Sequence, residues 1–180
     1  DVLRFLSRHG EDYFANNSVN GILNWYLSPD DNLRWYDDSF TPFNSVVYAG
    51  TMAASLIAVI ALLGPPLLLW RKRRPTQADL GAAAICTVIG SPVAWEHHYG
   101  ILLPLFLVAL YGILAMPAGR QRVVSMVMLT LSWIFVADFI PLTSLLAHGW
   151  AAAAQAYCFV GALLMLFLFL SQADTVCAEP

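Results

Sequence analysis

Hydrophobic residues dominate the chain after position 45, where they occur in long runs rather than in an alternating pattern. A run of about 20 apolar residues is long enough to cross the hydrocarbon core of a bilayer as an α-helix. The pattern therefore predicts an all-α fold, a polytopic transmembrane helical bundle with about five spans. The spans are expected near residues 46–70, 80–95, 99–116, 123–146 and 150–170.

Two stretches disturb this regular pattern. The Gly-Pro-Pro sequence at 64–66 is expected to kink or break the first span, because proline lacks the N–H that a helix interior needs. Residues 80–95 are short for a span, and a Gly-Ser-Pro sequence lies at 90–92. This run is either a short crossing or a re-entrant segment whose Ser-Pro end frays into a polar cavity.

Composition supports a membrane protein, since 59% of the residues are hydrophobic and 12% are charged. Soluble domains average about 45–50% apolar and about 25% charged residues. A net charge of −3, without a Lys/Arg stripe among aromatics, excludes a nucleic-acid partner. Cys86 and Cys158 fall in apolar runs and Cys177 lies in the tail, without metal-ligand spacing, so we expect them to act as small apolar residues.

Three regions follow from the pattern. Residues 1–45 are polar and aromatic and are expected to form an extracytoplasmic loop region with one short helix over 19–27. Residues 46–170 form the transmembrane region, and residues 171–180 a cytoplasmic tail. Because the chain starts at Asp1 without an initiator methionine or a signal peptide, we expect it to be the C-terminal part of a larger protein.

Basic residues set the expected orientation. The basic loops at 71–74 and 120–122 share one side if residues 80–95 cross the membrane. The positive-inside rule makes that side cytoplasmic. Residues 1–45 and the polar loop at 96–98 are then expected on the extracytoplasmic side.

The stretch Trp95-Glu96-His97-His98-Tyr99 is the densest polar and aromatic cluster near the expected membrane boundary. Imidazole titrates near neutral pH and can donate to a phosphate oxygen, and Glu96 can orient a histidine or act as a base. The alternative is an interfacial loop, because Trp and Tyr are common at membrane boundaries. No metal site is expected, since HExxH spacing is absent and adjacent side chains on a helix point in different directions.

A second polar cluster is Asn16-Asn17-Ser18-Val19-Asn20-Gly21. Its three amides and one hydroxyl can hydrogen-bond to sugar hydroxyls, with Trp25 or Tyr26 stacking on a sugar face. The alternative is that Asn17 or Ser18 only caps the short helix that follows.

Isolated charges leave two further choices open. Arg4, Arg8 and Arg34 are the cations expected on the extracytoplasmic side, where they either bind a lipid phosphate or balance nearby acids. Asp138, in the fourth run, is either a functional carboxylate or part of a loop end before Pro141.

The order of these motifs resembles glycosyltransferase family 87, polytopic enzymes of the C-type glycosyltransferase superfamily that include bacterial polyprenol-phosphate-mannose-dependent mannosyltransferases. Members carry an NQS motif and then an SPxxWxHH motif in their C-terminal half. In the first motif, Asn17 stands where the family usually has Gln. The second motif matches at Ser91, Pro92, Trp95, His97 and His98.

The resemblance implies an enzyme of the bacterial inner or plasma membrane that moves a hexose, with mannose as the expected sugar. The donor would be a polyprenyl-phosphate sugar, and the acceptor a glycolipid or cell-envelope glycan on the extracytoplasmic face. The sequence identifies no further cofactor, and the ion dependence of the whole enzyme stays open. The superfamily's catalytic carboxylate lies in the first extracytoplasmic loop, upstream of these motifs, so residues 1–180 are expected to be inactive alone.

Roles for individual residues follow from the same resemblance. His97 and His98 would hold the donor phosphate as it leaves, and Glu96 would position one of them. The expected substrate-binding residues are Asn16, Asn17, Ser18, Trp95 and Tyr99.

Two other classes of protein remain as alternatives. A proton-coupled transporter or flippase would use Glu96, His97, His98 and Asp138 as a proton relay, and such proteins usually contain internal repeats. No convincing repeat relates residues 46–95 to 99–170. A non-catalytic membrane scaffold would tolerate alanine at all of these positions.

Overall fold

The computed structural model describes residues 10–27, 32–33, 41–69, 76–137 and 149–175. The regular secondary structure of these residues is helical and no β-strand occurs among them, which confirms the prediction of an all-α fold. The helices are α2 (Val19–Leu27), α3 (Ser45–Leu69), α4 (Gln77–Ile89), the 3₁₀ helix η1 (Glu96–Ile101), α5 (Leu102–Ala115), α6 (Arg120–Val136), the 3₁₀ helix η2 (Gly149–Gln155) and α8 (Tyr157–Thr175).

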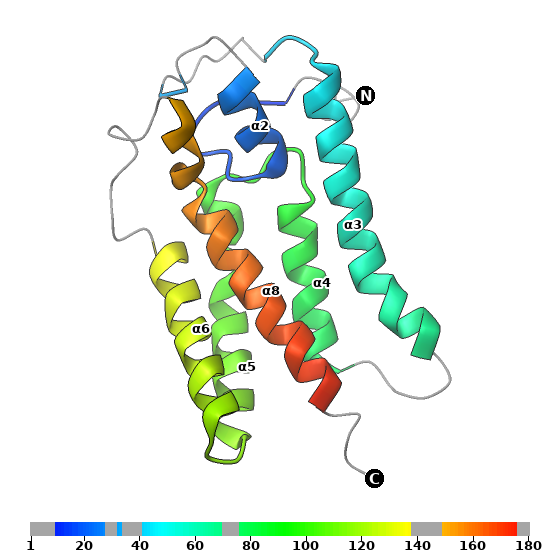
Figure 1. The fold of residues 1–180 in the computed structure, drawn as a ribbon, viewed down its shortest axis with the longest axis vertical. Helices are drawn as coiled ribbons and strands as arrows, with labels where there is room; N and C mark the ends of the chain where they lie inside the picture. Colours follow the sequence, from blue (N-terminus) through cyan, green and yellow to red (C-terminus); the bar gives the residue numbers. More distant parts are fainter. Residues whose placement is uncertain (1–9, 28–31, 34–40, 70–75, 138–148, 176–180) are drawn as a thin grey trace.

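The long helices alternate in direction along an elongated bundle (Figure 1). α2, the loop at residues 90–95 and η2 lie at one end, which we call the motif end. The turn between α5 and α6 and the C-terminal end of α8 lie at the opposite, distal end. The two polar clusters found in the sequence therefore lie at the same end of the bundle.

Two helical stretches, Ser45–Leu62 and Glu96–Ala115, are long and apolar enough to cross a membrane by length and composition. Within the described part of the chain, the apolar stretches Gln77–Ile89 and Tyr157–Ser171 are shorter than that. α6 has 17 residues. Among the described residues, two stretches are therefore long and apolar enough to be candidate spans, fewer than the about five that the sequence predicts.

Helix boundaries differ from the expected ones in several runs. α4 ends at Ile89, so residues 90–95 leave the helix where the Gly-Ser-Pro sequence stands. The last run is divided, because η2 precedes α8 and Ala156 separates them. α6 ends at Val136, and Asp138 with the residues up to 148 lies outside the described residues.

The first long helix passes through its two prolines. α3 continues through residues 64–66 and ends at Leu69, so the helix is not broken there. The sequence predicted a kink or a break, and the kink stays a prediction. The fixed φ of proline is compatible with a helix, although each proline removes one N–H donor.

Side-chain caps determine where α3 and α4 begin. Asn44 Oδ1 accepts a hydrogen bond from the N–H of Val46 at 2.9 Å. Thr76 and Asp79 form a capping box, in which the Asp79 carboxylate accepts from the Thr76 N–H at 2.7 Å. Such caps satisfy N–H groups that the first turn of a helix leaves without partners.

The apolar core lies where α4, α5, α6 and α8 meet. Gly81 permits a close approach of α4 to α8, because a Cβ there would lie 2.9 Å from the ring of Phe169. Cys86 and Cys158 are free thiols buried in this core, which confirms their prediction as small apolar residues. Other fully buried core side chains are Ile85, Ile113 and Met165.

Large apolar side chains also cover the outside of the bundle. Only 17% of the Ser45–Leu62 stretch is buried. Helices that are apolar on both faces are typical of a bundle surrounded by lipid. The exposed side chains include Leu56, Ile57 and Ile60 of α3, Leu103, Leu107 and Leu114 of α5, and Val123 and Val127 of α6.

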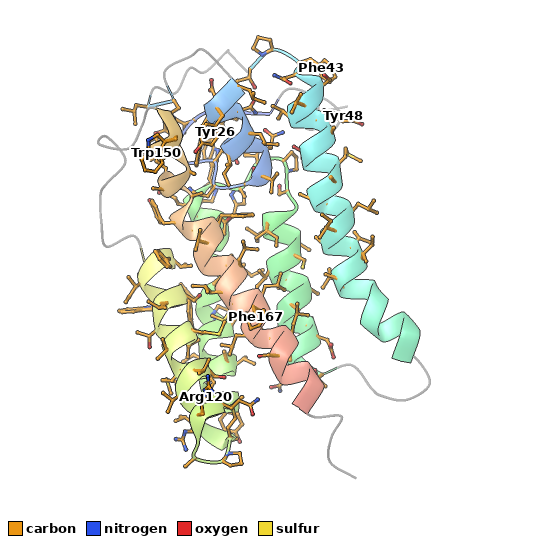
Figure 2. All side chains as sticks on the ribbon, viewed as in Figure 1. Tyr26, Phe43, Tyr48, Arg120, Trp150 and Phe167 are labelled. Carbon is orange, nitrogen blue, oxygen red and sulfur yellow. The ribbon has the colours of Figure 1, made fainter. Side chains whose placement is uncertain are left out.

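Aromatic side chains gather at the motif end. Figure 2 shows Tyr26, Phe43, Tyr48 and Trp150 there, and Arg120 at the distal end. Trp150 is the most exposed of these aromatics, at 90%. Tryptophan and tyrosine favour the boundary between membrane and water.

Candidate functional site

The two polar clusters are joined directly, although most of α2, α3 and α4 separates them in the chain. Asn16 and Trp95 form an isolated antiparallel β-bridge. The N–H of Asn17 donates to the carbonyl oxygen of Ala94 at 2.8 Å. The loop before α2 therefore lies against the loop after α4.

The side chain of Asn16 is the centre of this junction, and it is fully buried. Its Oδ1 accepts from the N–H of Ala94 at 2.9 Å. Its Nδ2 donates to the carbonyl oxygens of Glu11 at 3.0 Å and of Pro92 at 3.4 Å. Asn16 thus holds the backbone of residues 92–94, and its amide is used by the protein itself rather than presented to a substrate.

Ser18 completes the junction and starts α2. Its hydroxyl accepts from the N–H of Gly21 at 3.1 Å, so the alternative prediction of a helix cap is confirmed. The same hydroxyl lies 2.9 Å from Asn16 Oδ1 and 3.2 Å from the carbonyl oxygen of Pro92. Gly21 is needed here, because a Cβ would lie 1.9 Å from the carbonyl oxygen of Asn16.

Asn17 is also fully buried but is less completely bonded. Its Nδ2 donates to the carbonyl oxygen of Ala15 at 3.3 Å. Its carbonyl oxygen accepts from the hydroxyl of Tyr99, which is itself buried. Its Oδ1 has no hydrogen-bond partner among the described residues, so this oxygen can accept a donor from outside them.

His97 and His98 lie exposed and side by side in η1. Their ring centroids are 4.2 Å apart and their planes differ by 30°. The expectation that adjacent histidines point in different directions is wrong here. The physical reason is a hydrogen bond of 3.0 Å from the N–H of Trp95 to Nδ1 of His98, which turns that ring back over the start of the helix.

The same bond determines the tautomer of His98. Because Nδ1 accepts the N–H of Trp95, the proton of the neutral ring sits on Nε2. His98 is exposed and therefore offers an N–H donor to solvent. A phosphate oxygen is a suitable acceptor for such a donor.

Trp95 is tied to the N-terminal loop. Its indole N–H donates to the carboxylate of Glu11, which is buried. Its ring meets the ring of His97 edge to face, with centroids 5.6 Å apart. Trp95 therefore contacts both histidines, His97 through its ring and His98 through its backbone N–H, and its side chain is half-buried.

Glu96 has a partner that the sequence did not suggest. Its Oε1 accepts from the hydroxyl of Tyr157 at 2.9 Å, so the bond joins η1 to the first residue of α8. We expected Glu96 to orient a histidine, but this contact fixes the helix that carries both histidines. Nothing local in the sequence marks Tyr157 or Glu11, since each is an ordinary residue distant from the motif.

The two aromatic residues considered for sugar stacking differ in their exposure to solvent. Trp25 is buried, and its indole N–H donates to the carbonyl oxygen of Tyr13 at 3.3 Å. Tyr26 is 45% exposed, and its hydroxyl donates to the carbonyl oxygen of Trp150 at 2.7 Å. Only Tyr26 presents its ring to solvent.

Several predicted site residues cannot be placed. Arg4, Arg8, Arg34 and Asp138 lie outside the described residues. Within the described ranges, no group of three or more His, Cys, Asp or Glu side chains is arranged to hold a metal ion.

Comparisons with protein-family models, with curated proteins and with solved structures found no match to this chain. The resemblance to glycosyltransferase family 87 thus rests on the motif residues alone. Function has to be inferred from the geometry of the motif end, where one buried amide joins the two motifs beneath a pair of exposed histidines.

Proposed function

We propose that the chain belongs to a membrane glycosyltransferase that moves a hexose from a polyprenyl-phosphate donor to a glycolipid or cell-envelope glycan. One observation carries the proposal: two motifs that resemble family 87 meet at one end of the bundle, and their junction supports His97 and His98. The two motifs are far apart in the chain, and the hydrogen bonds between them support a shared site.

The proposed topology has five crossings, made by α3, α4, η1 with α5, α6 and α8. The motif end would face the extracytoplasmic side, and the distal end, with Arg120 and Arg122, the cytoplasm. The aromatic side chains at the motif end fit an interfacial position. Helices shorter than the hydrocarbon thickness would be accommodated by local thinning of the bilayer.

The proposed reaction is a displacement at C1 of the donor sugar. The acceptor oxygen forms a bond to C1, and the bond from C1 to the phosphate oxygen breaks with its electron pair. A carboxylate that the family carries upstream of its first motif takes the proton of the acceptor hydroxyl. Nε2–H of His98, and His97 beside it, donate to the phosphate as its negative charge grows.

The other motif residues have positioning roles in this proposal. Asn16 and Ser18 hold the loop that precedes the histidines, and Glu96 ties η1 to Tyr157. Asn17 differs, because its free Oδ1 can accept a hydrogen bond from a bound water or a substrate hydroxyl. The polyprenyl tail would lie against the apolar outer faces of the helices.

The test uses membranes that contain the protein in its natural length, supplied with labelled polyprenyl-phosphate mannose. Label entering glycolipid is compared between the wild type and a His97→Ala/His98→Ala variant of equal abundance. Loss of the phosphate donors should lower transfer by about 100-fold or more. A His148→Ala variant controls for the loss of a histidine elsewhere and should transfer like the wild type.

Each outcome has a distinct meaning. Unchanged transfer in the double variant would remove the histidines from the site. Absence of transfer even in the wild type would reject the mannose donor. Proton-coupled lipid flux in the same vesicles, lost in the double variant, would favour the transporter or flippase instead. A variant that behaves like the wild type in both assays would favour the scaffold.

A further inference from the structure

A pocket of about 410 Å³ opens between α6 and α8, in the distal half of the bundle and away from the histidines. This volume falls within the range of small-ligand sites, which is about 300–1,000 Å³. Figure 2 labels Arg120 and Phe167, which lie on its two sides. The pocket is lined by Arg120, Gln121, Val124, Ser125, Phe167 and Ser171, together with Met128.

One side of the pocket favours a negative charge. Arg120 supplies a guanidinium group and Gln121 an amide, both from the first turn of α6 and both exposed. The N-cap residue, Gly119, makes no side-chain cap, so the first N–H groups of α6 are not satisfied by a capping side chain. A helix N-terminus with this arrangement attracts anions.

A serine that is nearly buried as a residue also lines the pocket. Ser125 is 5% exposed, and its side chain forms no hydrogen bond within the described ranges. It lies five residues after Arg120, which is about 7.5 Å further along the helix axis. Its hydroxyl is accessible from the pocket and can donate to an acceptor oxygen of a ligand there.

The other side of the pocket is apolar and open. Val124 is 48% exposed and Phe167 is 62% exposed, and half-buried Met128 also lines the pocket. A free inorganic anion would make no favourable contact with such an apolar wall. A hydrocarbon chain attached to the anion would cover it and remove apolar surface from water or from loosely packed lipid.

We propose that this pocket binds an anionic phospholipid from the bilayer. The phosphate lies at Arg120, Gln121 and Ser125, and one acyl chain runs along Val124, Met128 and Phe167. The lipid binds at the end of the bundle opposite to the proposed sugar-transfer site, so it is not the sugar donor. The inference rests on the bundle being embedded in a membrane and not on its catalysing sugar transfer.

The test uses the purified, delipidated protein of natural length in an uncharged detergent. Dioctanoyl phosphatidylglycerol is titrated, and its dissociation constant is measured from the rise in Tm and by native mass spectrometry. Arg120→Gln should weaken binding about tenfold or more, because a hydrogen bond to a charged group is lost. Ser125→Ala should weaken it about threefold to tenfold. Arg122→Gln removes an equal charge one position beyond Gln121 but outside the pocket lining, and should bind like the wild type.

The remaining arms identify the source of the phosphate and separate this site from the motif end. Equal weakening by Arg120→Gln and Arg122→Gln would reduce the effect to general surface charge and overturn the site. Inorganic phosphate that competes with the lipid at similar concentration would overturn the lipid assignment. Equal binding of dioctanoyl phosphatidylcholine would overturn the requirement for an anionic lipid. The His97→Ala/His98→Ala variant should bind the lipid normally, whether or not it transfers sugar.

Discussion

The motif end and the four-helix core of the bundle differ in the polarity of their buried side chains. At the motif end, the fully buried side chains include Asn16, Asn17, Ser18 and Asn20, and each of them makes a hydrogen bond within the protein. In the core between α4, α5, α6 and α8, the buried side chains are mostly apolar. A polar group that is buried without a partner costs free energy, so the motif end tolerates far fewer arrangements than the core does.

A chain of amides extends the motif end from α2 to α3. Asn24 Nδ2 donates to Asn20 Oδ1 at 2.8 Å, and Asn20 Nδ2 donates to the hydroxyl of Thr51 at 3.0 Å. Thr51 in turn donates to the carbonyl oxygen of Val47 at 2.8 Å. Each hydrogen bond fixes a direction as well as a distance, whereas apolar contacts permit sliding. The hydrogen bonds therefore fix the structure near the histidines more tightly than apolar packing fixes the core. We expect substitutions at the motif end to lower the free energy of unfolding more than substitutions in the core.

The largest loss of stability is expected at Gly21, where α2 closely approaches the backbone of Asn16 at the motif end. Gly21→Ala would place a Cβ 1.9 Å from the carbonyl oxygen of Asn16, and backbone cannot give way as a side chain does. We expect a loss of about 4 kcal/mol in the free energy of unfolding, or failure to fold. Gly100→Ala is the matched control, because nothing lies within 4 Å of its Cβ position. Thermal unfolding in detergent decides, and equal Tm values for the two variants would contradict the close approach.

The next largest effect concerns the amide that joins the two motifs. Asn16→Leu would remove the hydrogen bonds that the Asn16 amide makes to the N–H of Ala94 and to the carbonyl oxygens of Glu11 and Pro92. We expect a loss of about 3 kcal/mol. Asn44→Ala removes an amide from the exposed cap of α3 and should cost about 1 kcal/mol. Denaturant titration compares the two variants, and a larger loss at Asn44 would reverse the ranking of buried and exposed amides.

Local signals made much of the fold predictable. The boundaries of α2 agree with the expected range of 19–27, because Ser18 caps its start and a Ser-Pro sequence follows its end. The long apolar runs likewise contain the long helices. The division of the last run by η2 was not predictable, because an alanine-rich sequence favours an α-helix and carries no local signal for a 3₁₀ helix.

The candidate site was predictable only in part. Its motifs stand out by residue type, but the bond from Asn16 to Ala94 joins residues 78 positions apart, and no local pattern encodes such a pairing. The partners Glu11 and Tyr157 were missed for the same reason. The residue types in Asn16-Asn17-Ser18 suggested sugar binding, whereas burial assigns Asn16 and Ser18 to the protein's own backbone. Burial is a property of the folded chain and not of the residue type.

A smaller effect is expected for the support beneath the histidines. The bond from the indole N–H of Trp95 to the Glu11 carboxylate is charge-assisted, so a double-mutant cycle with Glu11→Gln and Trp95→Phe should give a coupling of about 1.5 kcal/mol. Unfolding of the two single variants and the double variant supplies the cycle. A coupling near zero would show that Glu11 and Trp95 contribute independently.

The smallest effect is expected in the core, where α6 and α8 share one buried hydrogen bond. The hydroxyl of Ser132 donates to the carbonyl oxygen of Gly161 at 2.7 Å, while apolar contacts surround the pair. Bonds between helices in membranes average about 0.6 kcal/mol, and Ser132→Ala should cost about that much. Thr130→Ala is the control, since the exposed Thr130 hydroxyl bonds only within α6, to the carbonyl oxygen of Met126, and should leave the stability unchanged. Ser132→Ala could instead lower the free energy of unfolding as much as Asn16→Leu does. One polar contact, and not apolar packing, would then set the geometry of the core helices, and the contrast between the motif end and the core would be wrong.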